Sequence, residues 1–134
     1  MDKETLLEDA MVASLEAREG LKGRVCPVAE IKLNTGPLVV YEQRSETEEQ
    51  DLEGDSGLLT GGFQIHALHG TYKKMRLLCG AVKDALKELR GAKYQALTIE
   101  ALKVEQATPD ILEEKVGLFR RTYNVTFFYQ IKEE

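Results

Sequence analysis

The strictest pattern in the sequence is an alternation of apolar and polar residues between positions 118 and 131. Side chains of successive strand residues point to opposite faces of a sheet, so this alternation predicts a strand with one face against a core. The apolar positions are the odd ones: Phe119, Tyr123, Val125, Phe127, Tyr129 and Ile131. A chain that contains this strand must build a sheet and must supply an apolar layer to cover one face of it.

Two amphipathic helices can supply that layer. In residues 2–17, apolar side chains recur every three or four positions, and Gly20 and Gly23 follow the pattern. The second helix has Thr71 as its N-cap and Gly91 as its stop, with one apolar face running from Met75 to Leu89. Such spacing places the apolar residues on one side of a helix. Lysines on the opposite side of the second helix predict a solvated face.

The remaining strands are predicted from shorter runs, over residues 25–31, 38–44, 59–67 and 97–104. In the run 97–104 the apolar residues change parity, which predicts a β-bulge near Ala101. The resulting order is α-β-β-β-α-β-β. Strands joined by short turns favour an α+β fold with a mostly antiparallel sheet and two helices packed on one face. We expect residues 1–134 to form a single domain.

An acidic run, from Glu42 to Asp55, holds seven acids and one base, while the whole chain carries a net charge of −5. We expect a mobile acidic loop at about residues 45–57, inside a hairpin formed by the strands on either side of it. A nucleic-acid reader normally presents a basic face. The sequence shows none, so sequence-specific nucleic-acid binding is not expected.

The residues that could carry chemistry do not form a recognisable site. His66 and His69 are the only histidines, whereas a metal site needs three or four converging ligands. The pair Gly61 and Gly62 lacks the spacing of a phosphate-binding loop. The carboxylates of a solvated loop lack the burial that raises a pKa for acid–base catalysis. We therefore predict no enzymatic activity, no metal and no cofactor.

The cellular location is predicted from two features of the sequence, the length of its apolar stretches and the spacing of its cysteines. The chain has no stretch of about 18 apolar residues, the length needed to span a bilayer. Cys26 and Cys79 stand alone, which favours reduced thiols over a disulfide framework. We expect a protein made in the cytoplasm with no membrane contact.

Four stretches, taken in their order along the chain, resemble one known family. They match the tail-completion, or tail-terminator, proteins of long-tailed bacteriophages, which are also called minor capsid or tail-to-head joining proteins. His66 and Leu68 depart from that pattern, since relatives often carry an acid and an aromatic residue there. The stretches span most of the chain and read RVCPV, TGPLVVYEQRSE, GGFQIHALHGTYKKMRLLCGAVKDALKEL and VGLFRRTYNVTFFYQ.

This resemblance implies a structural subunit of the virion, at the head–tail junction, that assembles as a ring of six on the end of the tail tube. The ring would stop tube growth, dock the head connector proteins and let DNA pass without reading its sequence. The acidic loop would order against a tail or connector surface, or line the DNA passage. Arg121 falls on the apolar side of its strand, where it needs a partner charge or an edge position. The candidate interface residues are Glu46, Glu48, Glu49, Asp51, Glu53, Asp55, Arg120 and Arg121.

Two other functions remain open from the residues alone. One is a non-enzymatic protein-binding domain or assembly chaperone that holds a partner on its sheet. The other is metal-assisted hydrolysis through His66 and His69, which would require a metal retained through purification.

Overall fold

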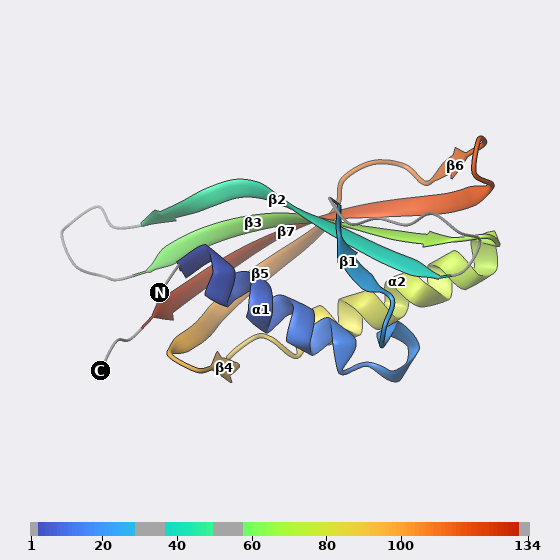
Figure 1. Ribbon diagram of the computed structural model, residues 1–134. Helices are drawn as coiled ribbons and strands as arrows, with labels where there is room; N and C mark the ends of the chain where they lie inside the picture. Colours follow the sequence, from blue (N-terminus) through green and yellow to red (C-terminus); the bar gives the residue numbers. More distant parts are fainter. Residues whose placement is uncertain (1–2, 29–36, 50–57, 132–134) are drawn as a thin grey trace.

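The computed structural model describes residues 3–28, 37–49 and 58–131, and it has two layers, a sheet and a pair of helices (Figure 1). The helices are α1 (Lys3–Glu16) and α2 (Tyr72–Lys87), and a short 3₁₀ turn, η1 (Glu19–Leu21), follows α1. The strands are β1 (Val25–Pro27), β2 (Leu38–Glu49), β3 (Leu59–His69), β4 (Lys93–Tyr94), β5 (Leu97–Gln106), β6 (Ile111–Glu113) and β7 (Leu118–Ile131). The predicted α+β class is confirmed.

The sheet has the strand order β1-β2-β3-β7-β5-β4, and β6 pairs with the first part of β7. The pairing of β1 with β2 is parallel, and the other pairings are antiparallel. The hairpin of β2 and β3 is present as predicted. The sequence did not predict β4, β6 or the parallel pairing. Strand β1 ends at Pro27, which has no amide hydrogen to donate, and residues 29–31 of the predicted strand lie outside the described residues.

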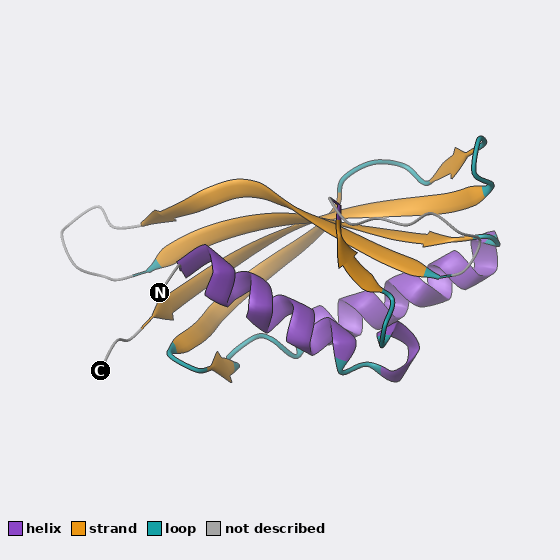
Figure 2. Cartoon of the chain, viewed as in Figure 1, coloured by secondary structure: helices purple, strands orange, loops and turns teal. Residues whose placement is uncertain are grey.

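Both helices lie against the same face of the sheet (Figure 2). The odd residues of β3 and β7 point toward them, so Ile65 and Val125 are fully buried between the layers. Helix α1 contributes Leu7, Met11 and Leu15 to this core. Burial of an aliphatic side chain of this kind stabilises a fold by about 1.5–3 kcal/mol. The prediction that the helices share one face with the odd residues of β7 is confirmed.

The predicted bulge lies in β5, where the register with β7 shifts between Ile99 and Ala101. Ile99 pairs with Tyr129, whereas after the bulge Leu102 pairs with Phe127. The extra residue reverses the parity of the strand, so apolar residues on both sides of the bulge face the helices.

The glycine pair lies within β3, and the closest approach to Gly61 comes from helix α1. A Cβ added at Gly61 would lie 2.6 Å from Leu7 Cδ2 and 3.5 Å from Tyr129 Cε1. Real Cβ contacts are longer than this, so the absence of a side chain at Gly61 lets α1 pack onto the sheet. The sequence predicted a bulge or a close backbone approach, and here a side chain fills the space. The strand opposite does carry a bulge, between Gln43 and Ser45.

The ends of two elements differ from the expected ones. Strand β2 continues to Glu49 and pairs there with Leu59, so the first residues of the predicted acidic loop have strand backbone. Residues 50–57 of that loop lie outside the described residues. Helix α2 ends at Lys87, and Gly91 adopts φ +76 after a turn. Thr71 is its N-cap as predicted and accepts a hydrogen bond from the Lys74 amide at 3.3 Å. No helix among the described residues is long and apolar enough to span a membrane.

Candidate interaction surface on the free face of the sheet

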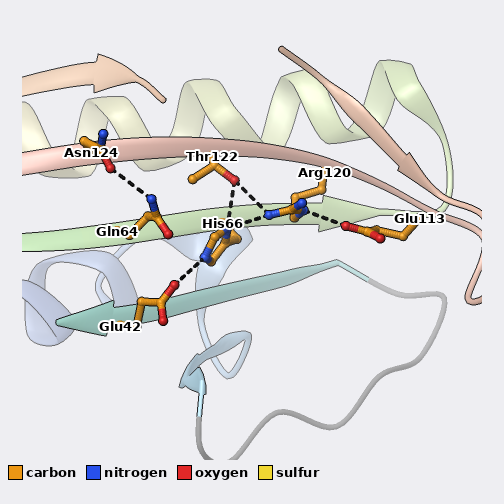
Figure 3. A network of polar contacts seen from close by, with 7 residues as sticks. All are labelled: Glu42, Gln64, His66, Glu113, Arg120, Thr122 and Asn124. Atoms are coloured by element: carbon orange, nitrogen blue, oxygen red, sulfur yellow. Dashed lines mark hydrogen bonds and ion pairs between the residues drawn. The ribbon is translucent and has the colours of Figure 1, made fainter. Parts of the chain in front are cut away.

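The face of the sheet opposite the helices, called the free face below, carries the even residues of β3 and β7. Four of the polar ones lie side by side because the register pairs Gln64 with Asn124 and His66 with Thr122. Figure 3 shows that Gln64 is bonded to Asn124, whereas His66 and Thr122 are linked to Glu42 of β2 and, through Arg120, to Glu113 of β6. Alternation explains why this network faces away from the core: the buried residues take the odd positions, so the polar ones share the other face.

His66 lies at the centre of the network, and only 11% of its side chain is exposed. Its Nδ1 lies 2.7 Å from Thr122 Oγ1 and 3.3 Å from Arg120 Nη1, and its Nε2 lies 3.2 Å from Glu42 Oε1. A guanidinium can only donate, so Nδ1 is the accepting nitrogen and the ring proton is on Nε2, facing the carboxylate. The hydrogen bonds therefore run in one direction, from Arg120 through Thr122 and His66 to Glu42.

Arg120 extends the network to the edge of the sheet. Its Nε donates to Glu113 Oε1 at 2.8 Å, and its Nη1 also donates to Thr122 Oγ1 at 3.3 Å. The first bond joins β7 to the short strand β6, and a further hydrogen bond of 3.1 Å joins Gln64 of β3 to Asn124 of β7. Strands β2, β3, β7 and β6 are thus connected by side chains as well as by the backbone ladder.

Thr122 is the residue on which this network depends. Among the described residues it is the one buried polar side chain, with 2% of its surface exposed. We expect Thr122→Val to lower the free energy of unfolding by about 1–2 kcal/mol, because a methyl group can neither accept from Arg120 nor donate to His66. Urea denaturation followed by circular dichroism measures this loss. Thr126→Val on the same strand is the matched control, since its exposed partner Arg44 can bond to water instead. If both variants lose the same free energy of unfolding, the network does not depend on Thr122.

Beside the network lies an open groove of about 800 Å³. Its floor continues a small apolar cluster, separate from the main core, in which Leu38, Val40, Leu68 and Leu118 are buried together. The groove is lined by apolar side chains such as Val28 and Leu112, and its charged lining includes Glu113 and Arg120. An apolar floor with a structured polar border is typical of a surface that binds another protein.

Arg120 and Arg121, both predicted interface candidates, lie on opposite faces of the sheet. Arg120 is on the free face, as described above. Arg121 faces the helices and has the partner charge it was expected to need, since it donates to both carboxylate oxygens of Asp110 at 2.7 and 2.8 Å. The hydrogen bonds from Arg121 hold the pKa of Asp110 down at about 2, and a 2.8 Å bond from Tyr72 acts in the same direction. The position of Arg121 on the apolar side of β7 is therefore explained by its ion pair with Asp110 within the subunit.

The acidic interface candidates are only partly described. Glu46, Glu48 and Glu49 belong to the outer end of β2, by their backbone. Asp51, Glu53 and Asp55 lie outside the described residues.

The two histidines point to opposite faces of β3, since they are three residues apart on a strand. The sequence placed His69 in a turn, whereas it is the last residue of β3. Burial, and to a lesser extent Lys74, lowers the pKa of His69. One ion could not take both imidazoles as ligands. Within the described part of the chain, no three histidine, cysteine or acidic residues are grouped closely enough to hold a metal.

Cys26 and Cys79 are not joined in a disulfide bond: Cys26 is half-buried and Cys79 is buried. Burial raises the pKa of the Cys79 thiol, which donates a hydrogen bond to Met75 Sδ at 3.5 Å. This thiol is a packing group of the core.

Sequence reasoning missed the network because its members come from four strands whose neighbours are set by register. One signal was present: the even positions in the middle of both strands are polar, Gln64 and His66 in β3 and positions 120–126 in β7, although each strand is also long enough to lie at the centre of a sheet. A strand buried on both faces would be apolar throughout. The even positions therefore indicate a face that is open to solvent or to a partner.

Comparison with known proteins identifies no family for the chain. No protein-family model matches it, and no curated protein matches it. Among solved structures, 24 chains match. One of them, whose printed name describes no function, is 13% identical and covers 95% of this chain and 96% of its own length, with a TM-score of 0.39. A likeness of this size carries no conclusion about function.

Proposed function

We propose that this protein is a structural subunit of a long-tailed bacteriophage that caps the tail tube and forms the tail-to-head joining interface as a hexameric ring. In this role it contacts copies of itself, the tail-tube protein and the head connector proteins, and DNA passes through the ring without sequence-specific contacts. It needs no cofactor and is located at the head–tail junction of the virion.

The observation that carries the proposal is the free face of the sheet. A subunit that covers one sheet face with two helices and leaves the other as a hydrogen-bonded polar network beside an apolar groove has a surface suited to a protein partner. The α+β fold is also the fold that the resemblance to tail terminators implies. Both points support an assembly role.

The test is light scattering over a concentration series, with and without polymerised tail-tube protein. We expect a ring, or a monomer that forms a ring on the tube, and we expect Leu68→Glu, which places a charge in the floor of the groove, to abolish binding to the tube. The exposed substitution Gln43→Glu is the control for added charge on the same hairpin. A protein that stays monomeric and indifferent to the tube would contradict the proposal and favour a protein-binding domain or assembly chaperone.

A further inference from the structure

Strand β5 is the last long strand on one side of the sheet (Figure 1). Among the described strands, the two-residue β4 is the one that lies beyond it, and β4 pairs with only its first two residues. Ile99 is also bonded outward, since it donates to the Ala92 carbonyl and accepts from the Gly91 amide. In the described part of the chain, residues 101–106 pair with β7 alone, so their other side is an unpaired strand edge.

This edge presents the backbone groups of every second residue. Ala107, directly after β5, donates its amide hydrogen inward to the Thr122 carbonyl at 2.8 Å. Along an antiparallel strand, residues alternate between backbone groups that face one neighbour and backbone groups that face the other. Counting back from Ala107, the N–H and C=O groups of Leu102, Val104 and Gln106 face outward. Unpaired groups of this kind are a template for a further strand.

The apolar side chains of the edge are incompletely covered. Leu102 and Val104 share a face with Phe127 and Val125 of β7, which is the face covered by the helices. Phe127 and Val125 are fully buried, whereas Leu102 and Val104 are only half-buried. A strand added beside β5 would cover these two side chains further, and burial of apolar surface favours such an addition.

Two charged side chains of opposite sign lie on the other side of the edge, the free face. Lys103 and Glu105 are bonded to each other at 2.7 Å, and their side chains are 69% and 56% exposed. This bond lowers the pKa of Glu105, and the positive charge of Arg44 on β2 has a smaller effect in the same direction. Glu100, the third charged residue of β5, lies within the bulge. An approaching strand therefore meets one positive and one negative charge, two residues apart.

These charges select one register for pairing the edge with a second copy of itself. Bonds form only where outward residues meet outward residues, so the two-fold axis of an antiparallel pair coincides with a residue. With the axis at Val104, Lys103 of each copy lies opposite Glu105 of the other. With the axis one residue away, two lysines or two glutamates meet, and like charges directly opposite are destabilising. An axis at Leu102 or Gln106 places both charges opposite uncharged residues.

We propose that the outer edge of β5 pairs with the same edge of a second copy of this chain, antiparallel and centred on Val104. The outward backbone groups of each copy bond to those of the other, and the two sheets become continuous. Lys103 and Glu105 exchange their partner within the subunit for one across the contact. They occupy the non-hydrogen-bonded positions of the new ladder, where opposite side chains lie closest together.

This inference goes beyond the proposed function and does not rest on it. The contact uses the same patch on both copies, as a two-fold interface does, so by itself it joins two chains and then closes. If the chain forms rings, the contact joins two rings. If it does not, the contact produces a dimer.

The experiment is sedimentation velocity of the full chain over a concentration series, with hydrogen–deuterium exchange of β5 at both ends of the series. We expect a reversible association of two copies and slower exchange of residues 102–106 where it is complete. Glu105→Lys places like charges opposite each other twice in the contact and should weaken association by about tenfold or more. The substitution also lowers the net charge of the chain from −5 to −5 + 2 = −3, so general repulsion between copies cannot explain the loss.

A second variant tests the backbone bonds. Val104→Pro removes an outward N–H at the centre of the contact and leaves the ladder with β7 intact, because proline is tolerated on an edge strand where its nitrogen faces solvent. We expect this variant to stay monomeric throughout the series. Its circular dichroism and thermal unfolding show whether the subunit itself is still folded, and the charge variants test the contact independently of that outcome.

The decisive variant combines Lys103→Glu with Glu105→Lys. Complementary charges are then restored with exchanged signs, so association should return close to that of the wild-type chain. Glu19→Lys, at an exposed position in η1, is the control for the change of charge and should associate as the wild-type chain does. The inference is wrong if the wild-type chain stays monomeric, if Glu105→Lys associates normally, or if the combined variant does not recover. Association that leaves the exchange of β5 unchanged would also overturn it.

The outcomes separate this inference from the proposed function. Lys103 and Glu105 are not among the residues that line the groove, so Glu105→Lys should bind tail-tube protein as the wild-type chain does. Chains that pair through β5 but ignore tail-tube protein would support the contact and contradict the tail-terminator role. Rings that form on the tube from a wild-type chain whose β5 edge never pairs would support the role and contradict this contact.

Discussion

Replacing Arg121 by alanine is expected to lower the free energy of unfolding by about 2–3 kcal/mol at neutral pH. The guanidinium and the Asp110 carboxylate bond through two atoms each, and each side chain is only 19% exposed. The substitution leaves the carboxylate with hydrogen bonds from Tyr72 and Gln106 but without its main partner, which costs more than the loss of a surface ion pair. The expected loss is below that for a fully buried pair because some solvent still reaches both groups. Urea denaturation measures it, and Arg90→Ala, at an exposed position in the turn after α2, is the control.

The same ion pair makes the stability of the protein depend on pH in the acidic range. The pKa of Asp110 is about 2 in the folded protein, against an ordinary value of 3.8. A folded-state pKa that is lowered adds stability above the unfolded value, and this contribution disappears as protons bind. It is therefore complete above about pH 4 and is lost as the pH falls toward 2, by about 1–2 kcal/mol after allowance for solvent screening.

The Arg121→Ala variant is expected to have a flatter stability curve between pH 4 and pH 2, because the cause of the lowered pKa has been removed. Asp110→Asn should flatten the same part of the curve by removing the titrating group. If Arg121→Ala unfolds at the wild-type urea concentration and keeps the wild-type acid slope, the ion pair does not stabilise the fold as described.

The second large effect is expected at Gly61, where helix α1 meets the sheet. Gly61→Val places a Cβ 2.6 Å from Leu7 Cδ2 and adds two methyl groups beside it. Overpacking a closed core typically costs about 1–3 kcal/mol, and we expect the upper end because Leu7 is itself 1% exposed and has little room to move. Thermal unfolding followed by circular dichroism measures the change.

A double substitution tests the cause of this loss. Leu7→Ala alone should destabilise by about 2–5 kcal/mol through the cavity it leaves. When the two are combined, valine occupies part of that cavity, so the double variant should be more stable than the sum of the single losses predicts. Gly20→Val, at a glycine with open space around it, is the control for the change of residue type. Additive losses in the double variant would show that Leu7 and Gly61 do not share the space.

Local patterns were sufficient to predict the main elements of the fold. The alternation in β7 and the parity change at Ala101 each identified a strand feature from a few neighbouring residues, because side-chain direction in a strand depends on position alone. Strands β4 and β6 are two and three residues long, too short to show a period. They form because they pair with strands that already exist.

Contacts between distant residues were not predictable in the same way. The sequence indicated that Arg121 needs a partner, but Asp110 belongs to a loop whose position depends on the completed sheet. The network around His66 likewise depends on the register of three strands.

The central position of β7 has a consequence for how the chain is made. Strand β7 lies between β3 and β5, and it pairs with β3 from Leu59↔Tyr129 to His69↔Phe119. Ribosomes release residues in order, so β3 emerges well before its neighbour and presents an unpaired edge until residues 118–131 follow. An exposed strand edge is a template for pairing with other chains. A nascent chain stalled before Leu118 should therefore require a holding chaperone, and a slow search for long-range pairs should precede the native sheet.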